Sequence, residues 1–124
     1  MPALPNEFSA DLDSLRAWVG DDLDLLDEIA AEFVVQVPHW IAHLESAVGA
    51  RDAEGLHRAA HSLKGAVGPF RVPAVRDPAA ALEALGATGR LDQAPALLAG
   101  LRPALLHLAA SIATRPWRSA PASL

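Results

Sequence analysis

A run of apolar residues at helical spacing dominates the sequence between positions 22 and 48. Its members lie three or four residues apart: Leu26, Ile29, Phe33, Val37, Ile41, Leu44 and Val48. Residues at this spacing share one face of an α-helix, so the run predicts a long helix that buries one side against other helices. Pro38 lies inside the run and lacks a backbone N–H, and we expect it to kink the helix near Val34.

Start and stop signals indicate four further helices. Ser9 is expected to cap a short helix that ends near Val19, where Gly20 interrupts the helical pattern. Asp21 is expected to cap the long helix that follows. Three more helices are expected after the long one: from the cap Asp52 to Gly68, from the cap Asp77 to Leu85, and from the cap Asp92 to Ala113. 

Prolines after the third helix indicate where the backbone is irregular or bent. Residues 69–78 hold three prolines and are expected to be irregular, with Pro78 in the first position of the fourth helix and a stop at GATG, residues 86–89. Pro95 is tolerated in the first turn of the fifth helix, and Pro103 is expected to bend it.

Composition decides how these helices pack. Of the 124 residues, 52% are hydrophobic but only 5% are aromatic, so alanine and leucine must fill the core, which favours packed helices over a β-sandwich. With short connections, this predicts an all-α fold, an antiparallel up-down four-helix bundle with a short extra N-terminal helix. We expect residues 1–8 to be a flexible lead-in, 9–113 to form the bundle and 114–124 to be a flexible tail.

Charge and composition also narrow the classes of partner. A formal net charge of -5 argues against nucleic acid, and the absence of cysteine excludes disulfides and thiolate metal sites. The N-terminus does not resemble a signal peptide, and no apolar run approaches the roughly 20 residues that a membrane span needs. We therefore expect a cytoplasmic protein, or a domain of one, that does not bind membranes.

The segment AHSLKGAVG, residues 60–68, places a histidine, a lysine and two glycines in a predicted helix. At about 100° per residue, His61 points away from the core stripe, with Lys64 beside it and His57, Gly65 and Gly68 on the same side. The core stripe comprises Leu56, Ala60, Leu63, Val67 and Phe70. Each glycine costs a helix interior about 1 kcal/mol relative to alanine, so the sequence keeps them for another purpose.

This arrangement suits transfer of a phosphoryl group to histidine. Neutral imidazole, with an unperturbed pKa near 6.5, is a nucleophile at neutral pH. Lys64 can offset the negative charge of the transferring group, and the glycines leave room for the rim of another protein's cleft that holds a donor aspartate. No Gly-rich phosphate loop precedes a helix, so we expect no nucleotide site and no ATP-dependent kinase activity.

The segment AAHSLKGAVG resembles the A-H-x-L-K-G signature of histidine-containing phosphotransfer (HPt) domains. GDDLDLLDEIAAEF resembles the family's second helix, and ALEAL the segment that faces the active helix. The resemblance covers roughly residues 9–113. It implies a helical bundle, usually monomeric, that accepts a phosphoryl group from a receiver-domain aspartate and passes it to another receiver in two-component signalling.

The same resemblance implies roles for individual residues. His61 would be phosphorylated through Nε2, Lys64 would stabilise the phosphoryl group, and Gly65 would give the receiver access. Glu83 would hydrogen-bond the other ring nitrogen and so fix the tautomer, with Gly68 and His57 in support. The chain would need no cofactor of its own, since Mg²⁺ is expected in the partner receiver.

After the motif, the sequence departs from the family pattern. HPt domains commonly continue with Asn, an apolar residue and Gly-Ala, whereas this chain continues with Pro69, Phe70, Arg71 and Val72. We expect these residues to distort the start of the fourth helix and to alter the surface on which a receiver docks.

Three other interpretations remain open on the sequence. Glu54, His57 and His61 have a spacing that can ligate zinc but lack a clear fourth ligand, and His39 and His43 are taken as solvated. A sensor-kinase dimerisation domain also phosphorylates a helix histidine, but it usually has an acidic residue where Ser62 stands here. A bundle that binds and sequesters a receiver without transfer is the alternative function.

Overall fold

The computed structural model describes residues 10–118, which form five α-helices and two short 3-10 helices, with no β-strand among them. The elements are α1 (Leu12–Trp18), α2 (Leu23–Gly49), α3 (Ala53–Val67), η2 (Gly68–Phe70), α4 (Pro73–Thr88), α5 (Ala94–Ala113) and η3 (Pro116–Arg118). The all-helical class that the sequence predicted is confirmed.

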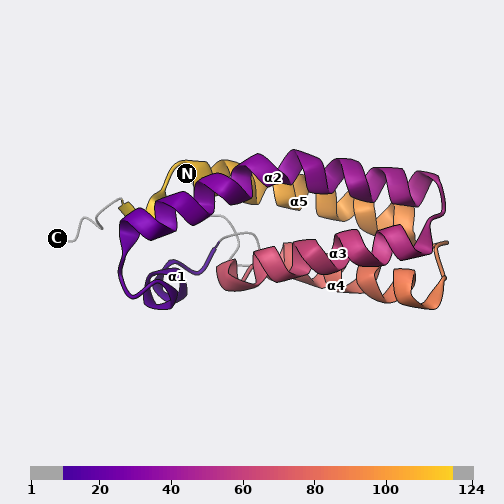
Figure 1. Ribbon diagram of the computed structural model, residues 1–124, viewed down its shortest axis with the longest axis horizontal. Helices are drawn as coiled ribbons and strands as arrows, with labels where there is room; N and C mark the ends of the chain where they lie inside the picture. Colours follow the sequence, from indigo (N-terminus) through magenta and orange to yellow (C-terminus); the bar gives the residue numbers. More distant parts are fainter. Residues whose placement is uncertain (1–9, 119–124) are drawn as a thin grey trace.

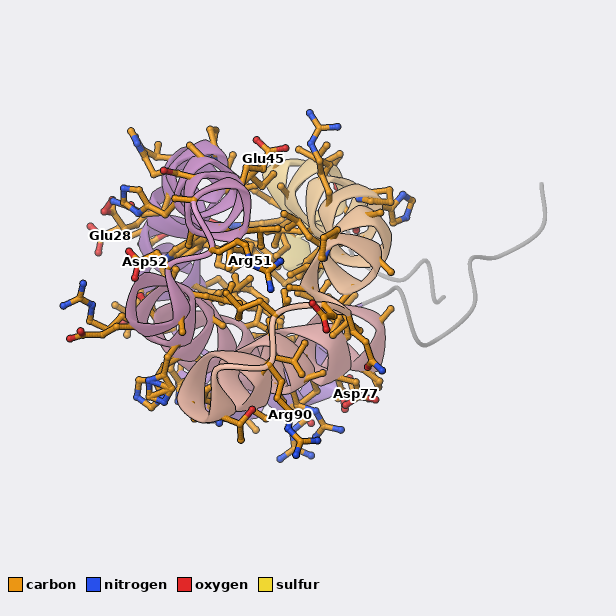
Figure 2. All side chains as sticks on the ribbon, turned by 90° about the vertical axis from the view of Figure 1, so that its right-hand side faces the viewer. Glu28, Glu45, Arg51, Asp52, Asp77 and Arg90 are labelled. Atoms are coloured by element: carbon orange, nitrogen blue, oxygen red, sulfur yellow. The ribbon has the colours of Figure 1, made fainter. Side chains whose placement is uncertain are left out.

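The four long helices lie side by side, and consecutive helices run in opposite directions (Figure 1). α2 packs on α3, α3 on α4, α4 on α5 and α5 back on α2, so the four enclose one core. Viewed from one end, side chains from all four helices fill the space between them, and charged groups point outward (Figure 2). The short α1 packs across one end, where it contacts α2, η2 and η3.

The core is built mostly from alanine, leucine and valine, as the composition predicted. In α2 the buried face comprises Leu26, Ala30, Phe33, Val37, Ile41, Leu44 and Ala47. Ala30 and Ala47 are buried in place of Ile29 and Val48, which are both half-buried. Val48 packs against the edge of the core. Both α2 and α5 continue as single helices through an internal proline, Pro38 and Pro103.

The N-terminal caps follow the sequence in part. Asp52 caps α3 as predicted and accepts a hydrogen bond from the Gly55 amide at 2.9 Å. The cap of α2 is Asp22 rather than Asp21, because Gly20 and Asp21 both adopt positive φ in the preceding turn. Ser9, the predicted cap of α1, lies outside the described residues, and Asp11 caps that helix.

The fourth helix begins five residues earlier than predicted. Its first residue is Pro73, and Asp77 and Pro78 lie inside it. Pro73 suits the first helical position as well as Pro78 does, and burial of Val75 in the first turn ties this earlier start to the core. The irregular backbone is thus confined to η2 and the turn after it, where Arg71 adopts a left-handed conformation with φ 54°.

The end of α4 and the start of α5 also differ from the prediction, whereas α5 ends at Ala113 as predicted. α4 runs through Gly86 to Thr88, and Gly89, at φ 73°, ends it. Gln93 rather than Asp92 precedes α5, and no side chain caps that helix. The Asp92 carboxylate instead pairs with Arg51, in the α2–α3 turn, at 3.2 Å.

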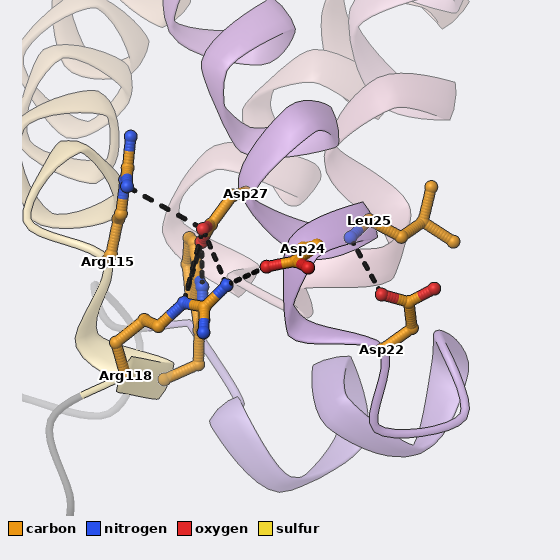
Figure 3. Close-up of polar contacts among 7 residues, drawn as sticks. Asp22, Asp24, Leu25, Asp27, Arg115 and Arg118 are labelled. Carbon is orange, nitrogen blue, oxygen red and sulfur yellow. Dashed lines mark hydrogen bonds and ion pairs between the residues drawn. The ribbon is translucent and has the colours of Figure 1, made fainter.

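Residues 114–118, predicted as part of a flexible tail, pack against the helices. The Trp117 side chain is 4% exposed, and its indole N–H donates to Asp27 at 2.7 Å. Arg115 and Arg118 also pair with Asp27, and Arg118 reaches Asp24, so η3 is tied to the first turns of α2 (Figure 3). We call the set of Asp24, Asp27, Arg115, Trp117 and Arg118 the C-terminal clamp. They hold η3 in place because charged groups converge on one partly buried carboxylate.

One helix among the described residues is long and apolar enough to cross a membrane, although the sequence pattern suggested none. It is the segment Ala94–Arg118, which contains α5. Between positions 94 and 113 its one charged residue is Arg102, which explains the high hydropathy. Eight residues of α5 are buried in the core of the bundle.

Candidate functional site

His61 lies on the outer side of α3, with its side chain 69% exposed. The opposite side of the helix is the stripe that the sequence predicted, and it is fully buried: Leu56, Ala60, Leu63, Val67 and, in η2, Phe70. The neighbouring Ser62 accepts a hydrogen bond from the Trp40 indole of α2 at 3.3 Å. The buried stripe and the Trp40–Ser62 hydrogen bond thus hold α3 in place, while the His61 imidazole is exposed to solvent.

Glu83 of α4 brings the polar residues of the site together. Its Oε2 atom lies 2.5 Å from His61 Nδ1, and its Oε1 atom lies 2.5 Å from the Lys64 ammonium. The Glu83 side chain is 15% exposed, so it sits between the helices. Four of the predicted site residues, His57, His61, Lys64 and Glu83, thus form one cluster on the α3–α4 face.

The close packing of α3 on α4 depends on a glycine that the sequence reading took as a helix stop. At Gly86 a Cβ atom would meet the His57 backbone nitrogen at 2.6 Å and the Ala53 carbonyl oxygen at 2.8 Å. The two helices are antiparallel, so one turn back from Gly86 along α4 is Glu83, and one turn on from His57 along α3 is His61. The missing side chain at Gly86 lets the carboxylate reach the imidazole.

The electrostatics of the cluster determine the tautomer of His61. Hydrogen bonds from Lys64 and then His61 hold the pKa of the Glu83 carboxyl below its ordinary value, although partial burial opposes this. An ionised carboxylate can only accept, so His61 Nδ1 carries the proton and donates it. In the neutral ring, Nε2 then keeps its lone pair and lies on the exposed edge.

His57 is a second imidazole beside the same carboxylate. Its Nε2 atom lies 3.9 Å from Glu83 Oε2, and its ring lies nearly parallel to that of His61, at 16° with centroids 6.2 Å apart. Glu54, the third member of the suggested zinc set, pairs with Arg58 instead. Within residues 10–118, no three histidine, aspartate or glutamate side chains gather as a ligand set for a metal ion.

Gly65 and Gly68 leave the surface next to His61 bare. A Cβ atom at either position would meet no atom within 4 Å, so neither glycine serves helix packing. Gly65 lies one turn beyond His61, and Gly68 begins η2. The structure thus separates two kinds of glycine: Gly86 brings two helices together, whereas Gly65 and Gly68 leave access from outside.

Sequence reasoning missed several residues near this site. Gly86 was hidden because a glycine that packs helices and one that ends a helix look alike in a sequence. Trp18 and Leu25, which are exposed and line a groove beside Gly65, were not identified as residues near the site. Their signal lies in three dimensions, because they come from α1 and α2 and meet α3 only in the fold.

Comparisons with known proteins identify a family and a similar fold. The family model described as Hpt domain matches residues 28–113. The structure is similar to the crystal structure of histidine-containing phosphotransfer protein B (HptB) from Pseudomonas aeruginosa PAO1, with a TM-score of 0.76 and 23% sequence identity. The match covers 92% of this chain and 95% of that one. No curated protein matches the sequence.

Proposed function

The chain belongs to the Hpt domain family, and from this premise we propose that it accepts a phosphoryl group on His61 from a receiver-domain aspartate and passes it to a second receiver. Hpt domains are histidine phosphotransfer modules that interact with the receiver domains of two-component signalling. The observation that carries the proposal is the contact between His61 Nδ1 and Glu83, because in the neutral ring a proton held at Nδ1 leaves the lone pair on Nε2, in a side chain that is largely exposed.

The proposed transfer is a displacement at phosphorus, in which His61 replaces the donor aspartate. The Nε2 lone pair forms a bond to phosphorus as the bond from phosphorus to the donor aspartate's oxygen breaks, and that carboxylate leaves with the electron pair. The Nδ1 proton stays on the ring, which becomes positively charged. Glu83 stabilises this charge through the hydrogen bond that it already accepts. Transfer to the second receiver is the same step in reverse.

Lys64 is placed to act on the phosphoryl group. One of the three N–H groups of its ammonium donates to Glu83, and the side chain is partly exposed. The other two N–H groups can therefore donate to phosphoryl oxygens. The Glu83 contact also holds the ammonium on the His61 side of α3. We propose that no cofactor is needed in this chain, because Mg²⁺ belongs to the receiver that supplies the acyl phosphate.

The finer architecture is part of the same proposal. The alternating directions of α2 to α5 in Figure 1 support an antiparallel up-down four-helix bundle, with α1 as the extra N-terminal helix. A single bundle with His61 on its outer surface needs no second subunit to complete the site, which supports a monomer. The proposed role in receiver signalling supports a cytoplasmic location.

A phosphotransfer assay tests the proposal. The chain is incubated with a receiver domain carrying radioactive aspartyl phosphate, and acid-labile, base-stable label is measured on the chain. The wild type and His39→Gln, a control at an exposed α2 histidine, should acquire the label, whereas His61→Gln should not. Tight receiver binding without label on any variant would support sequestration instead, and label on His61→Gln would refute the assignment of His61.

A further inference from the structure

The carboxylate oxygen that contacts His61 has room for one more donor. Glu83 Oε2 lies 2.5 Å from His61 Nδ1 and 3.9 Å from His57 Nε2. An oxygen of an ionised carboxylate has two lone pairs, so Oε2 can accept a hydrogen bond from each imidazole. The distance to His57 is too long for a hydrogen bond but short enough for an ion pair if that ring is charged. The contact between His57 and Glu83 therefore depends on the protonation of His57.

The packing of α3 on α4 fixes His57 in this position. Gly86 of α4 lies against the backbone here, since a Cβ atom at position 86 would meet the His57 nitrogen at 2.6 Å. The His57 ring lies nearly parallel to the His61 ring, with centroids 6.2 Å apart. The His57 side chain is 42% exposed, so water can supply a proton to it or remove one. His57 is thus held beside the reacting ring and remains accessible to solvent.

The other titratable groups of α3 and α2 near His57 have different surroundings. Glu54, one turn before His57 on α3, pairs with Arg58 at 3.6 Å. His39 and His43 of α2 line a groove between α2 and α3, together with Arg58, and His57 is not part of its lining. The short η2, which also contacts α3, contains no charged residue. These three elements therefore offer His57 no carboxylate that could replace Glu83.

From α4, the ionisable group that faces His57 is Glu83. The other two ionisable residues of this helix, Arg76 and Asp77, pair with each other at 2.9 Å near its start. Arg90 follows the end of α4, beyond the point where Gly86 meets α3. The protonation of His57 should therefore respond mainly to Glu83 and to the charge at the neighbouring His61.

Phosphorylation changes the charge of this cluster. Before transfer, the Glu83 carboxylate and the Lys64 ammonium cancel, and two neutral imidazoles add no charge. Afterwards, the phosphoryl group adds about two negative charges and the His61 ring one positive charge, so the cluster has a net charge of about -1. Lys64 is also attracted to the phosphoryl oxygens, which weakens its contact with Glu83. A proton on His57 would neutralise the cluster and give Oε2 a second donor, because both nitrogens of a charged imidazole donate.

We propose that His57 is a positioning residue for phosphoryl transfer: it takes up a proton from solvent when His61 is phosphorylated, and it then holds Glu83 beside the charged ring. The proton returns to solvent when the phosphoryl group leaves. This rests on the proposed function, because a phosphorylated His61 supplies the added charge. By linkage, a proton that is bound more tightly in the phosphorylated state makes a fall in pH favour that state. The charges lie roughly 6 Å or more apart near solvent, so we expect an effect of about two- to threefold.

The first measurement uses the wild-type chain and needs no change at His57. The chain is labelled with phosphoramidate, a small donor that reacts with histidine without a receiver, and the donor is then removed. ¹⁵N NMR of the histidine rings between about pH 6 and pH 8 gives the protonated fraction of His57 before and after labelling. We expect a larger protonated fraction after labelling. His61→Gln is the control, and its His57 should be unchanged by the donor.

The second measurement is the lifetime of the label after the donor is removed. In His57→Gln the side-chain amide can still donate to Glu83 but cannot take up a proton. The label on the wild type should outlast that on His57→Gln about two- to threefold near pH 6, and the ratio should approach one near pH 8. His39→Gln, which removes an exposed histidine from α2, should follow the wild type. A ratio that does not change with pH would show that His57 acts only on the structure, and would overturn the proposal.

The outcomes distinguish this proposal from the proposed function. Label on the wild type with an unchanged protonated fraction of His57 would overturn the role of His57 and leave His61 phosphorylation standing. Failure of the wild type to take label from either phosphoramidate or a phosphorylated receiver domain would overturn the proposed function, and the role of His57 with it. A larger protonated fraction of His57 together with a pH-dependent lifetime ratio would support both.

Discussion

At the scale of single residues, one carboxylate organises the site. Glu83 accepts from His61 and Lys64 through different oxygens, so it sets the ring tautomer and the position of the ammonium together. A histidine alone on a helix would exchange its proton between two nitrogens. In the proposed transfer, the contact with Glu83 leaves the neutral ring with one nucleophilic atom, Nε2.

Replacing Glu83 should therefore change the tautomer of His61. In Glu83→Ala the Nδ1–H loses its acceptor, so ¹⁵N NMR of the neutral ring should show a mixture of the Nδ1–H and Nε2–H tautomers, where the wild type should show the Nδ1–H tautomer alone. Labelling by phosphoramidate should slow about tenfold, as loss of one charge-assisted hydrogen bond implies. Glu54→Ala, which removes an exposed carboxylate from α3, the helix that carries His61, is the control. An unchanged tautomer in Glu83→Ala would contradict this role.

Lys64 should matter after transfer as well as during it. Lys64→Ala removes the ammonium from beside the phosphoryl group, so the phosphohistidine should hydrolyse faster and transfer should slow. The fold should persist, because the side chain is partly exposed and, within residues 10–118, pairs only with Glu83. The lifetime of the labelled protein after removal of the donor measures this. A lifetime equal to that of the wild type would remove Lys64 from the mechanism.

At the scale of the helices, the site is a property of the α3–α4 pair. His61 and Glu83 are brought together because the two helices approach closely at Gly86, one turn away. No contact with any other element is needed to explain the His61–Glu83 hydrogen bond. The same pair leaves the α2 side of α3 free for the groove that holds Gly65.

A methyl group at position 86 should separate the pair. In Gly86→Ala the new Cβ would clash with the His57 backbone, so α4 must move away and the His61–Glu83 bond should lengthen or break. We expect the ¹⁵N spectrum of His61 to shift toward that of Glu83→Ala, and the melting temperature to fall. Gly100→Ala in α5, where a Cβ meets nothing within 4 Å, is the matched control and should leave the spectrum unchanged. A wild-type His61 spectrum in Gly86→Ala would rule out this dependence.

What the sequence predicted well is local to one helix. The core stripe of α3 and the exposure of His61 follow from spacing, because helical geometry alone decides which side each residue takes. Where two signals competed, the prediction was wrong: Asp77 and Pro78 looked like a helix start, but Pro73 offers the same advantage earlier. Contacts between residues that are distant in the sequence, such as Gly86 with His57 or Trp117 with Asp27, produce no periodic pattern in the sequence and could not be predicted from it. For Glu83, only the family resemblance indicated a partner.

At the scale of the whole molecule, the C-terminal clamp joins the last described residues to the start of α2. Asp27 accepts from Trp117 and pairs with two arginines, and the hydrogen bonds from Arg118 and then Trp117 hold its pKa below the ordinary value (Figure 3). The pKa of Arg118 is correspondingly raised by Asp27 and then Asp24. The clamp lies outside residues 28–113, so it is an addition to the part that the family model matches.

The clamp should make stability depend on acid. Because the pKa of Asp27 is lower in the folded state, its contribution is complete above the ordinary aspartate value and is lost as the pH falls through the folded value. Asp27→Asn should thus lower the denaturation midpoint at pH 7, and its difference from wild type should narrow below about pH 4. Trp117→Ala should cost about 3 kcal/mol at neutral pH, typical of a buried tryptophan. A pH-independent difference for Asp27→Asn would contradict the assignment.

The contact between α1 and η3 has one more consequence, because it brings the two ends of the described chain to the same pole of the bundle. A circular permutant that fuses those ends and opens the chain at the α2–α3 turn would keep every helix and both partners of the His61–Glu83 pair. Such a rewired protein should still take label from phosphoramidate. The order in which the helices are synthesised would then be irrelevant to the chemistry that they support.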